Sequence, residues 1–151
     1  MEERALQIRH ACRDDLRALL DLYQHLNPGD ERPRLDLAAQ ALDRFMTYPG
    51  SGIFVGEADA VMVCSCTLIV VPNLTRGGRP FGLIENVVTH RDFRRRGFGA
   101  RILEAASAGC YKVMLMTGST SPETLSFYAG AGFEQSKTGF QKRRIAVRTD
   151  A

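Results

Sequence analysis

One stretch in the middle of the chain constrains its fold more than any other. An apolar, β-prone run at 86–89 leads through three consecutive arginines, 94–96, to Gly97 and Gly99, after which the pattern becomes helical. A strand, turn and helix in this order present bare main-chain N–H groups and the positive end of a helix dipole. Glycines let a ligand approach the main chain closely, and arginines are permanently charged, bidentate donors. The stretch therefore predicts a binding site for a polyphosphate.

Two common polyphosphate motifs do not fit this stretch. A Walker loop requires Gly-Lys-Ser or Gly-Lys-Thr, and neither follows the glycines. The dinucleotide fingerprint Gly-x-Gly-x-x-Gly fails at its third glycine, where Ile102 stands, and it lies in mid-chain after several expected strands. Taken alone, the pattern is also compatible with a charged turn that ends at a glycine.

The composition is that of one globular domain over residues 1–151, because 44% of the residues are hydrophobic and can form one core. No run approaches ~18 apolar residues, so no membrane partner is expected, and Met1–Ala5 lacks the apolar run of a secretory signal. The four cysteines are not spaced as zinc ligands, and no metal is expected. Basic clusters at 91–101 and 142–148 lack interleaved aromatic residues, so no nucleic-acid partner is expected.

Hydrophobic periodicity and turn residues predict the order of elements. Helices are expected at 13–25, 35–47, 98–108 and from Pro122 to Gly130 or Gly132. Strands are expected at 5–10, 52–55, 60–71, 81–89, 111–116, 133–136 and 139–147, with a hairpin turn at 56–59. The order β-α-α-β-β-β-α-β-α-β-β predicts a single-domain α/β (α+β) fold, with helices on both faces of a mixed, mostly antiparallel sheet of six or seven strands. Cys64 and Cys66 should share one face as buried thiols.

Three features in combination identify a family. A strand rich in Val and Ile leads into Arg94-Arg-Arg-Gly97-Phe-Gly99, another strand follows the helix, and Phe127-Tyr128-Ala-Gly-Ala-Gly132-Phe133 comes later. Together they closely resemble the GNAT superfamily of acetyl-CoA-dependent N-acetyltransferases, and most sharply so over 82–134. The strand at 84–89 and the segment 109–113 also resemble those of glucosamine-phosphate and related small-amine acetyltransferases.

This resemblance implies a coenzyme site. Acetyl-CoA would be the co-substrate, with its pyrophosphate held by main-chain N–H groups from Arg95 to Ala100 and its pantetheine arm paired with the strand as an added strand. The arginine side chains could also contact the 3′-phosphate. Ser121 stands where many relatives carry an asparagine that touches the coenzyme, although its hydroxyl can instead cap a helix. The implied coenzyme-binding residues are Val87, Val88, Thr89, Arg94, Arg95, Arg96, Gly97, Phe98, Gly99, Ala100 and Ser121.

Acetyl transfer to an amine needs a base, a donor to the carbonyl oxygen and an acid for the departing thiolate. Glu85 is the candidate base or amine ligand, with an ion pair to an arginine as the alternative. The N–H of Val87, on a bulged strand, is the candidate donor. The resemblance makes Tyr128 the candidate acid, with packing beside Phe127 as the alternative. Asn86 stands where the glucosamine-phosphate relatives often carry aspartate, which weakens any transfer of their sugar specificity.

The predicted function is transfer of the acetyl group from acetyl-CoA to a primary amine of a small molecule. Transfer is expected to be direct within a ternary complex, because no cysteine or serine has an evident base partner. A non-catalytic acyl-CoA-binding regulatory domain and a protein N-terminal or lysine acetyltransferase are the alternatives. Family analogy implies a homodimer formed through the C-terminal strands or sheet edges. A cytoplasmic location is expected.

The acceptor pocket is the least constrained part of the prediction. Two loops are expected to line it, and their arginines would favour an anionic amine unless they are merely solvated: Arg32, Arg34, Arg76 and Arg79. His25 and His90 are interpreted as surface residues rather than catalysts, and Tyr23 as half-buried packing.

Overall fold

The computed structural model describes residues 5–145, which fall into two compact units that meet between Leu115 and Met116. The first unit contains β1 (Gln7–His10), η1 (Arg13–Asp15), α1 (Leu16–Tyr23), α2 (Leu35–Phe45), β2 (Gly52–Ala58), β3 (Val61–Val71), η2 (Arg76–Gly78), β4 (Phe81–Thr89), η3 (Arg91–Phe93), α3 (Phe98–Ser107) and β5 (Val113–Leu115). The second unit contains α4 (Pro122–Gly130). A single domain over residues 1–151 stays a prediction.

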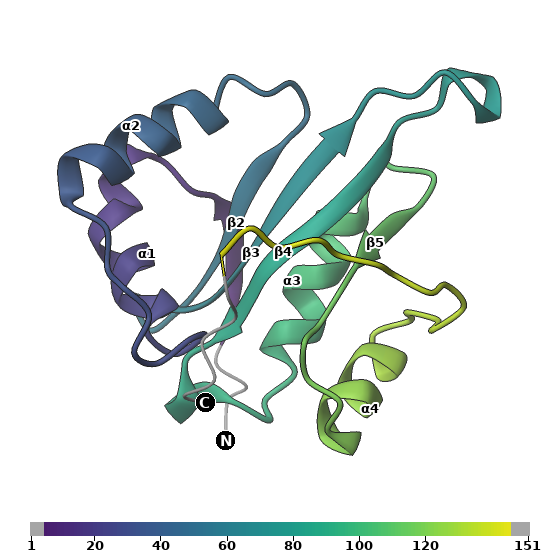
Figure 1. Cartoon of the computed structure of the whole chain (residues 1–151). Helices are drawn as coiled ribbons and strands as arrows, with labels where there is room; N and C mark the ends of the chain where they lie inside the picture. Colours follow the sequence, from purple (N-terminus) through teal and green to yellow (C-terminus); the bar gives the residue numbers. More distant parts are fainter. Residues whose placement is uncertain (1–4, 146–151) are drawn as a thin grey trace. The chain divides into compact units, whose positions relative to one another are not determined.

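The strands of the first unit form one sheet of five strands in the order β1-β2-β3-β4-β5 (Figure 1). Strands β1 to β4 pair antiparallel, and β5 runs parallel to β4 because α3 crosses over between them. The predicted class, an α/β fold with a mixed, mostly antiparallel sheet and helices on both faces, is confirmed.

Side chains along β3 alternate between helices on opposite faces of the sheet. The thiols of Cys64 and Cys66 each lie 3.9 Å from a main-chain oxygen of α3. Ser65 and Thr67 instead form hydrogen bonds with the side chain of Tyr23, the last residue of α1. Because successive residues of a strand point to opposite sides, α1 and α3 cover opposite faces. The predicted shared face of the two cysteines is confirmed.

Apolar side chains fill the space between the helices and the sheet. On the α1 side, Leu19 packs with Ala11 and Val55. In α3, Ile102 and Leu103 have no solvent-exposed surface. Full burial of each such side chain contributes about 1.5–3 kcal/mol. The helices are therefore held to the sheet mainly by apolar burial.

The predicted hairpin turn at 56–59 is wrong. Strand β2 continues to Ala58, and the turn consists of Asp59 and Ala60, whose φ angles of 52° and 62° are left-handed, as in the tight hairpin turns that match strand twist. Gly56 lies inside the strand. A Cβ there would lie 2.5 Å from the Sγ of Cys64. This glycine therefore allows close packing and does not form the turn.

The second unit has fewer elements than predicted. Among its described residues there is no strand, so the expected strands at 133–136 and 139–147 are wrong as far as residue 145, while residues 146 and 147 lie outside the described range. The stretch 134–139 is polar and lacks the apolar alternation of a half-buried strand, and Phe140 is 93% exposed. The described sheet therefore has five strands rather than six or seven.

Candidate active site

The turn between β4 and α3 opens toward solvent. Arg95 and Gly97 adopt left-handed φ angles of 63° and 76°. The first main-chain bond of α3 runs from the N–H of Arg101 to the oxygen of Gly97. The N–H groups of 98–100 consequently have no acceptor within the helix. A Cβ on Gly97 would meet no atom within 4 Å, so a ligand can approach this main chain. The geometry suits an anion at the helix N-terminus.

Strand β4 is paired on both sides only along its first half. On the β5 side the ladder ends where Ile84 lies opposite Leu115. The edge of β4 at 85–89 therefore has no partner strand on that side among residues 5–115. This edge contains Val87, Val88 and Thr89 and can accept hydrogen bonds from, and donate them to, an extended ligand.

A β-bulge interrupts β4 at the start of this unpaired edge. The register with β3 shifts between Glu85, opposite Thr67, and Val88, opposite Ser65. Asn86 lies in the shifted segment with a φ of 51°. Asparagine is one of the few residues that tolerates this conformation, so the residue type fits the backbone. The bulge bends β4 and changes the direction of the N–H groups that follow it.

Glu85 lies on β4 directly before the bulge. It faces the same side of the sheet as its cross-strand partner Thr67, which is the side that α1 covers. Its side chain is exposed, and within residues 5–145 its carboxylate has no ion pair or hydrogen bond. The alternative role as an ion-pair partner of an arginine therefore has no support in this part of the chain.

Tyr23 is half-buried, as predicted, but it does more than pack. Its hydroxyl shares hydrogen bonds with Thr67 and Ser65, and burial raises the pKa of the phenol. Both partners are buried, and the Ser65 hydroxyl donates to the oxygen of Phe54 at 2.8 Å. This polar cluster was missed by the sequence reasoning, and its only signal is the pair of hydroxyl residues two apart in an apolar strand.

Two arginines of the turn bind the protein's own main chain. The Nε of Arg94 donates to the oxygen of Thr89 at 3.2 Å, and its Nη2 donates to the oxygen of His25 at 3.1 Å. The Nη2 of Arg96 donates to the oxygen of Asp92 at 3.2 Å, and its guanidinium lies over the ring of Phe93, 5.1 Å from the centroid. These side chains stabilise the turn. A contact from Arg94, Arg95 or Arg96 to a phosphate stays a prediction.

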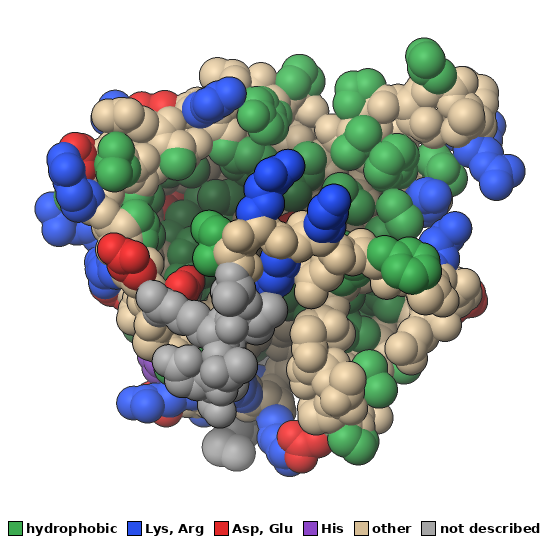
Figure 2. All heavy atoms as spheres, in the orientation of Figure 1, with side chains coloured by type: hydrophobic (Ala, Val, Ile, Leu, Met, Phe, Trp, Pro, Cys, Tyr) green, Lys and Arg blue, Asp and Glu red, His purple; other side chains and the backbone are tan. Residues whose placement is uncertain are grey.

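The four arginines expected at the acceptor cleft are not gathered at one place. Arg32 and Arg34 form ion pairs with aspartates of α1 and α2, at 2.5 and 2.6 Å. Arg76 and Arg79 lie in the loop before Phe81, at the end of β4 away from the turn, roughly 16 Å along the strand from the bulge. Figure 2 shows basic and hydrophobic side chains together at the tip of this loop.

His25 and His90 are half-buried rather than open surface residues. Their ring centroids lie 4.0 Å apart. Burial, together with His90, lowers the pKa of His25. The pair packs the end of α1 against the residue that follows β4.

In the second unit, the ring of Tyr128 packs edge-on against Phe127 and Phe133, at centroid distances of 5.0 and 6.1 Å. The hydroxyl of Ser121 accepts a hydrogen bond from the N–H of Thr124 and so caps α4. The predicted helix start is confirmed. The roles of Tyr128 and Ser121 toward a coenzyme stay predictions.

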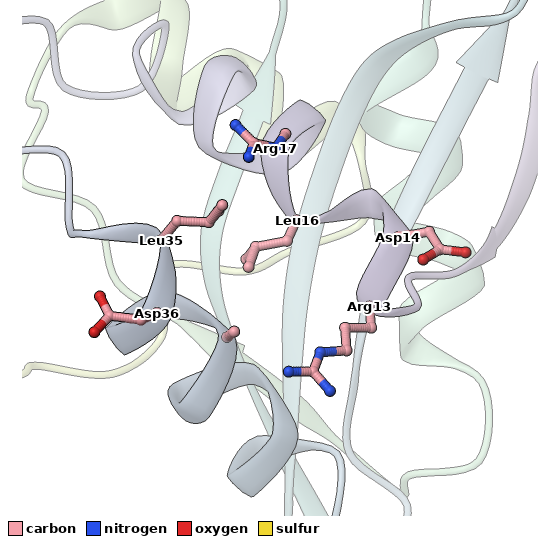
Figure 3. Close-up of a pocket in the computed structure, with 7 residues that line it drawn as sticks. Arg13, Asp14, Leu16, Arg17, Leu35 and Asp36 are labelled. Carbon is pink, nitrogen blue, oxygen red and sulfur yellow. The ribbon is translucent and has the colours of Figure 1, made fainter.

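A shallow pocket of about 620 Å³ lies elsewhere in the first unit, between η1, α1 and α2 (Figure 3). Its walls include Arg13, Leu16, Arg17 and Leu35. None of the predicted site residues lines it. Among the described residues, no three His, Cys, Asp or Glu side chains gather as a metal site requires, and none of the helices is long and apolar enough to span a bilayer.

The chain is also similar to known proteins in sequence and in fold. Residues 49–135 match the family model described as an acetyltransferase (GNAT) domain. Glucosamine 6-phosphate N-acetyltransferase of Trypanosoma brucei brucei is 32% identical over 85% of this chain and 88% of that protein. A candidate acetyltransferase from Agrobacterium tumefaciens str. C58 is 43% identical, with a TM-score of 0.86 over 91% of this chain and 99% of that one. Glucosamine-6-phosphate N-acetyltransferase from Arabidopsis thaliana has a TM-score of 0.80 over 93% of this chain and 99% of that one, and its 22% identity supports the fold alone.

Proposed function

Because this chain belongs to the GNAT acetyltransferase family, we propose that it transfers the acetyl group of acetyl-CoA to the primary amine of a small molecule. The observation that carries the proposal is the sequence of features along β4: a bulge at Asn86, an edge at 87–89 without a partner strand among the described residues of the first unit, and an exposed turn at Gly97 that leads into α3. An extended thioester with a diphosphate needs an edge and an anion site in this order.

The main chain supplies most of the coenzyme contacts in this proposal. The N–H groups from Arg95 to Ala100 hold the pyrophosphate, and the edge at 87–89 aligns the pantetheine arm. Acetyl-CoA supplies the acetyl group as a thioester. The N–H of Val87 donates to the carbonyl oxygen, where negative charge develops as the amine attacks.

Two side chains move the protons. Glu85 removes a proton from the substrate ammonium, directly or through water, and its exposed and unpaired carboxylate within residues 5–145 supports this role. The amine nitrogen then bonds to the carbonyl carbon and loses its second proton to water, and the carbon–sulfur bond breaks. Tyr128 gives its proton to the departing thiolate, and the phenolate takes up a proton from solvent. This second assignment rests on the Phe-Tyr pattern of α4.

Direct transfer within a ternary complex is the proposed route. A covalent route needs a reactive nucleophile, and burial raises the pKa of both Cys64 and Cys66 to about 12, which removes their thiolates at neutral pH. No acyl-enzyme on either sulfur is therefore included.

We take an amino sugar phosphate as the first acceptor to test, because a relative that acts on glucosamine 6-phosphate is 32% identical to this chain. Asn86, in place of the aspartate expected from that family, and the ion pairs that already occupy Arg32 and Arg34 make this the least supported part of the proposal. Arg76 and Arg79, roughly 16 Å along β4 from the bulge, lie too far from it to hold the phosphate of a sugar whose amine reacts there, so the preference for an anionic acceptor is left to the assay.

Release of free coenzyme A from acetyl-CoA tests the proposal directly. The pure protein is incubated with glucosamine 6-phosphate, glucosamine, an aminoglycoside and a peptide with a free N-terminus. Turnover with a small amine but not with the peptide is expected, and a preference for the phosphorylated sugar would establish the anionic acceptor. Binding of coenzyme A by calorimetry without turnover on any amine would favour the regulatory-domain alternative.

A homodimer and a cytoplasmic location are also proposed. The sheet ends in the short strands β1 and β5, whose outer edges could pair with a second copy. The four cysteines are unpaired thiols, which is typical of a reducing compartment. Sedimentation of the full chain at two concentrations tests the dimer.

A further inference from the structure

The side chain of Arg94 joins two segments that are 69 residues apart in the sequence. Its Nε donates to the oxygen of Thr89, the last residue of β4, at 3.2 Å. Its Nη2 donates to the oxygen of His25, just beyond α1, at 3.1 Å. One guanidinium therefore connects the β4–α3 turn to His25, two residues before the 27–34 loop begins.

Two further contacts hold the same region. The rings of His25 and His90 pack at 4.0 Å between centroids, next to the Arg94 bonds. Within the loop, the Nη1 of Arg32 donates to the carboxylate of Asp21 in α1 at 2.5 Å. The 27–34 loop is thus fixed near its beginning by the turn and near its end by α1.

We infer that the Arg94 side chain is a positioning residue that holds the 27–34 loop against the β4–α3 turn. The planar guanidinium can donate to two carbonyl oxygens in different directions, whereas a lysine ammonium has one nitrogen. This part of the inference rests on the proposed function. If that function holds, Arg94 fixes the position of the 27–34 loop, where the amine would bind, relative to the β4–α3 turn, where the coenzyme would bind. Its side chain then serves the amine site rather than a phosphate.

Hydrogen–deuterium exchange on the full chain without ligands tests this clamp, that is, whether Arg94 holds the 27–34 loop against the β4–α3 turn. The amides of Leu26 and Asn27 bond to the oxygen of Tyr23, and the amide of Asp30 bonds to the oxygen of Asn27, so they report on the loop. In Arg94→Lys, exchange at these amides should accelerate about tenfold, because both carbonyl bonds cannot be kept. Exchange at the buried Val55, which is paired with β1 and β3, should not change, which shows that the fold is intact.

Arg91→Lys is the matched control. Arg91 lies on the same turn and is exposed; among the described residues it pairs with Asp92 at 3.8 Å and acts on His25 through its charge, which Arg91→Lys keeps. Its variant should leave the loop amides at the wild-type rate. Unchanged loop exchange in Arg94→Lys, or equal acceleration in both variants, overturns the inference.

Calorimetry with coenzyme A separates the clamp from a phosphate contact. A clamp predicts that Arg94→Lys binds coenzyme A within about threefold of wild type while the loop amides exchange faster. Weaker coenzyme binding in Arg94→Ala that lysine restores, with unchanged loop exchange, would assign the side chain to a phosphate instead. The exchange readout needs no turnover, so it stands even if no amine is acetylated and the proposed function fails. Once an acceptor is known, its KM should rise in Arg94→Lys more than the KM for acetyl-CoA does.

Discussion

A phenol can protonate a departing thiolate only if its hydroxyl lies close to the sulfur, and Tyr128 is proposed for this step. Tyr128→Phe keeps the ring that packs against Phe127 and Phe133 and removes only the hydroxyl. The value of kcat should fall about a hundredfold, while the affinity for coenzyme A by calorimetry stays unchanged. Tyr48→Phe, which alters a tyrosine 44% exposed, should retain full activity. Equal activity of the two variants would exclude Tyr128 as the acid.

Loss of the Glu85 carboxylate should reduce kcat/KM most at pH values where the substrate amine is protonated. Glu85→Gln is expected to lower kcat/KM by about tenfold to a hundredfold at pH 7, because no carboxylate remains to take the ammonium proton. An alkylamine has a pKa of about 10.4, so the neutral amine becomes more abundant at pH 9 and the defect should shrink there. A pH profile of both proteins measures this, with Glu104→Gln, an exposed residue of α3, as the control. A defect of constant size across pH would assign Glu85 a role other than that of base.

At the scale of one element, the bulge in β4 depends on the residue at position 86. Asn86→Val puts a β-branched side chain at a φ of 51° and should destabilise the fold by about 1–2 kcal/mol. Asn86→Gly, which adopts this conformation without strain, should be close to wild type. Urea denaturation and the affinity for coenzyme A measure both effects. If Asn86→Val and Asn86→Gly change the free energy of unfolding and the affinity for coenzyme A equally, the left-handed φ is not the reason for asparagine at this position.

Some elements could be predicted from the sequence and others could not. Strand β4 begins and ends where its apolar run predicts, and α4 begins after its Ser-Pro cap, because these signals are local. Gly56 misled the prediction, since its role is a contact with Cys64 from the next strand. The strands predicted at 133–136 and 139–147 are wrong as far as residue 145, because the polar stretch at 134–139 has no apolar alternation to support a strand.

Across the first unit, the side chain of Arg9 joins three elements. Arg9 of β1 forms ion pairs with Asp15 of η1 at 2.7 Å and Glu57 of β2 at 2.9 Å. The bond from Arg9 lowers the pKa of Asp15 from 3.8 to about 2. Since the pKa is lower in the folded state, this stability is present above pH 3.8 and is lost as the pH falls through 2.

Asp15→Asn should therefore lower the free energy of unfolding by about 2 kcal/mol at pH 7 and by much less near pH 2. Asp43→Asn is the matched control, because the pair of Asp43 with Arg13 is exposed and 3.7 Å long. Urea denaturation of the three proteins at several pH values measures the difference. A constant gap between Asp15→Asn and wild type over this range would contradict the assignment.

The parts of the site formed by one short segment could be predicted from the sequence, whereas the contacts between distant segments could not. The glycines and the strand before them identify the turn within a dozen or so residues, as short phosphate motifs do. The bonds from Arg94 to His25 and from Tyr23 to Thr67 join residues far apart in the sequence. They depend on how α1 lies on the sheet, which no local pattern encodes.

Because the sulfurs of Cys64 and Cys66 are buried against α3, their alkylation can report on transient separation of α3 from the sheet. Cys64 and Cys66 have no exposed surface, whereas Cys12 is open to solvent. An alkylating reagent should label Cys12 at once and the half-buried Cys110 next, and should reach Cys64 and Cys66 only when α3 separates from the sheet. The rate of the slow phase of labelling, measured by mass spectrometry, would then give the rate at which α3 separates from the sheet in the intact protein.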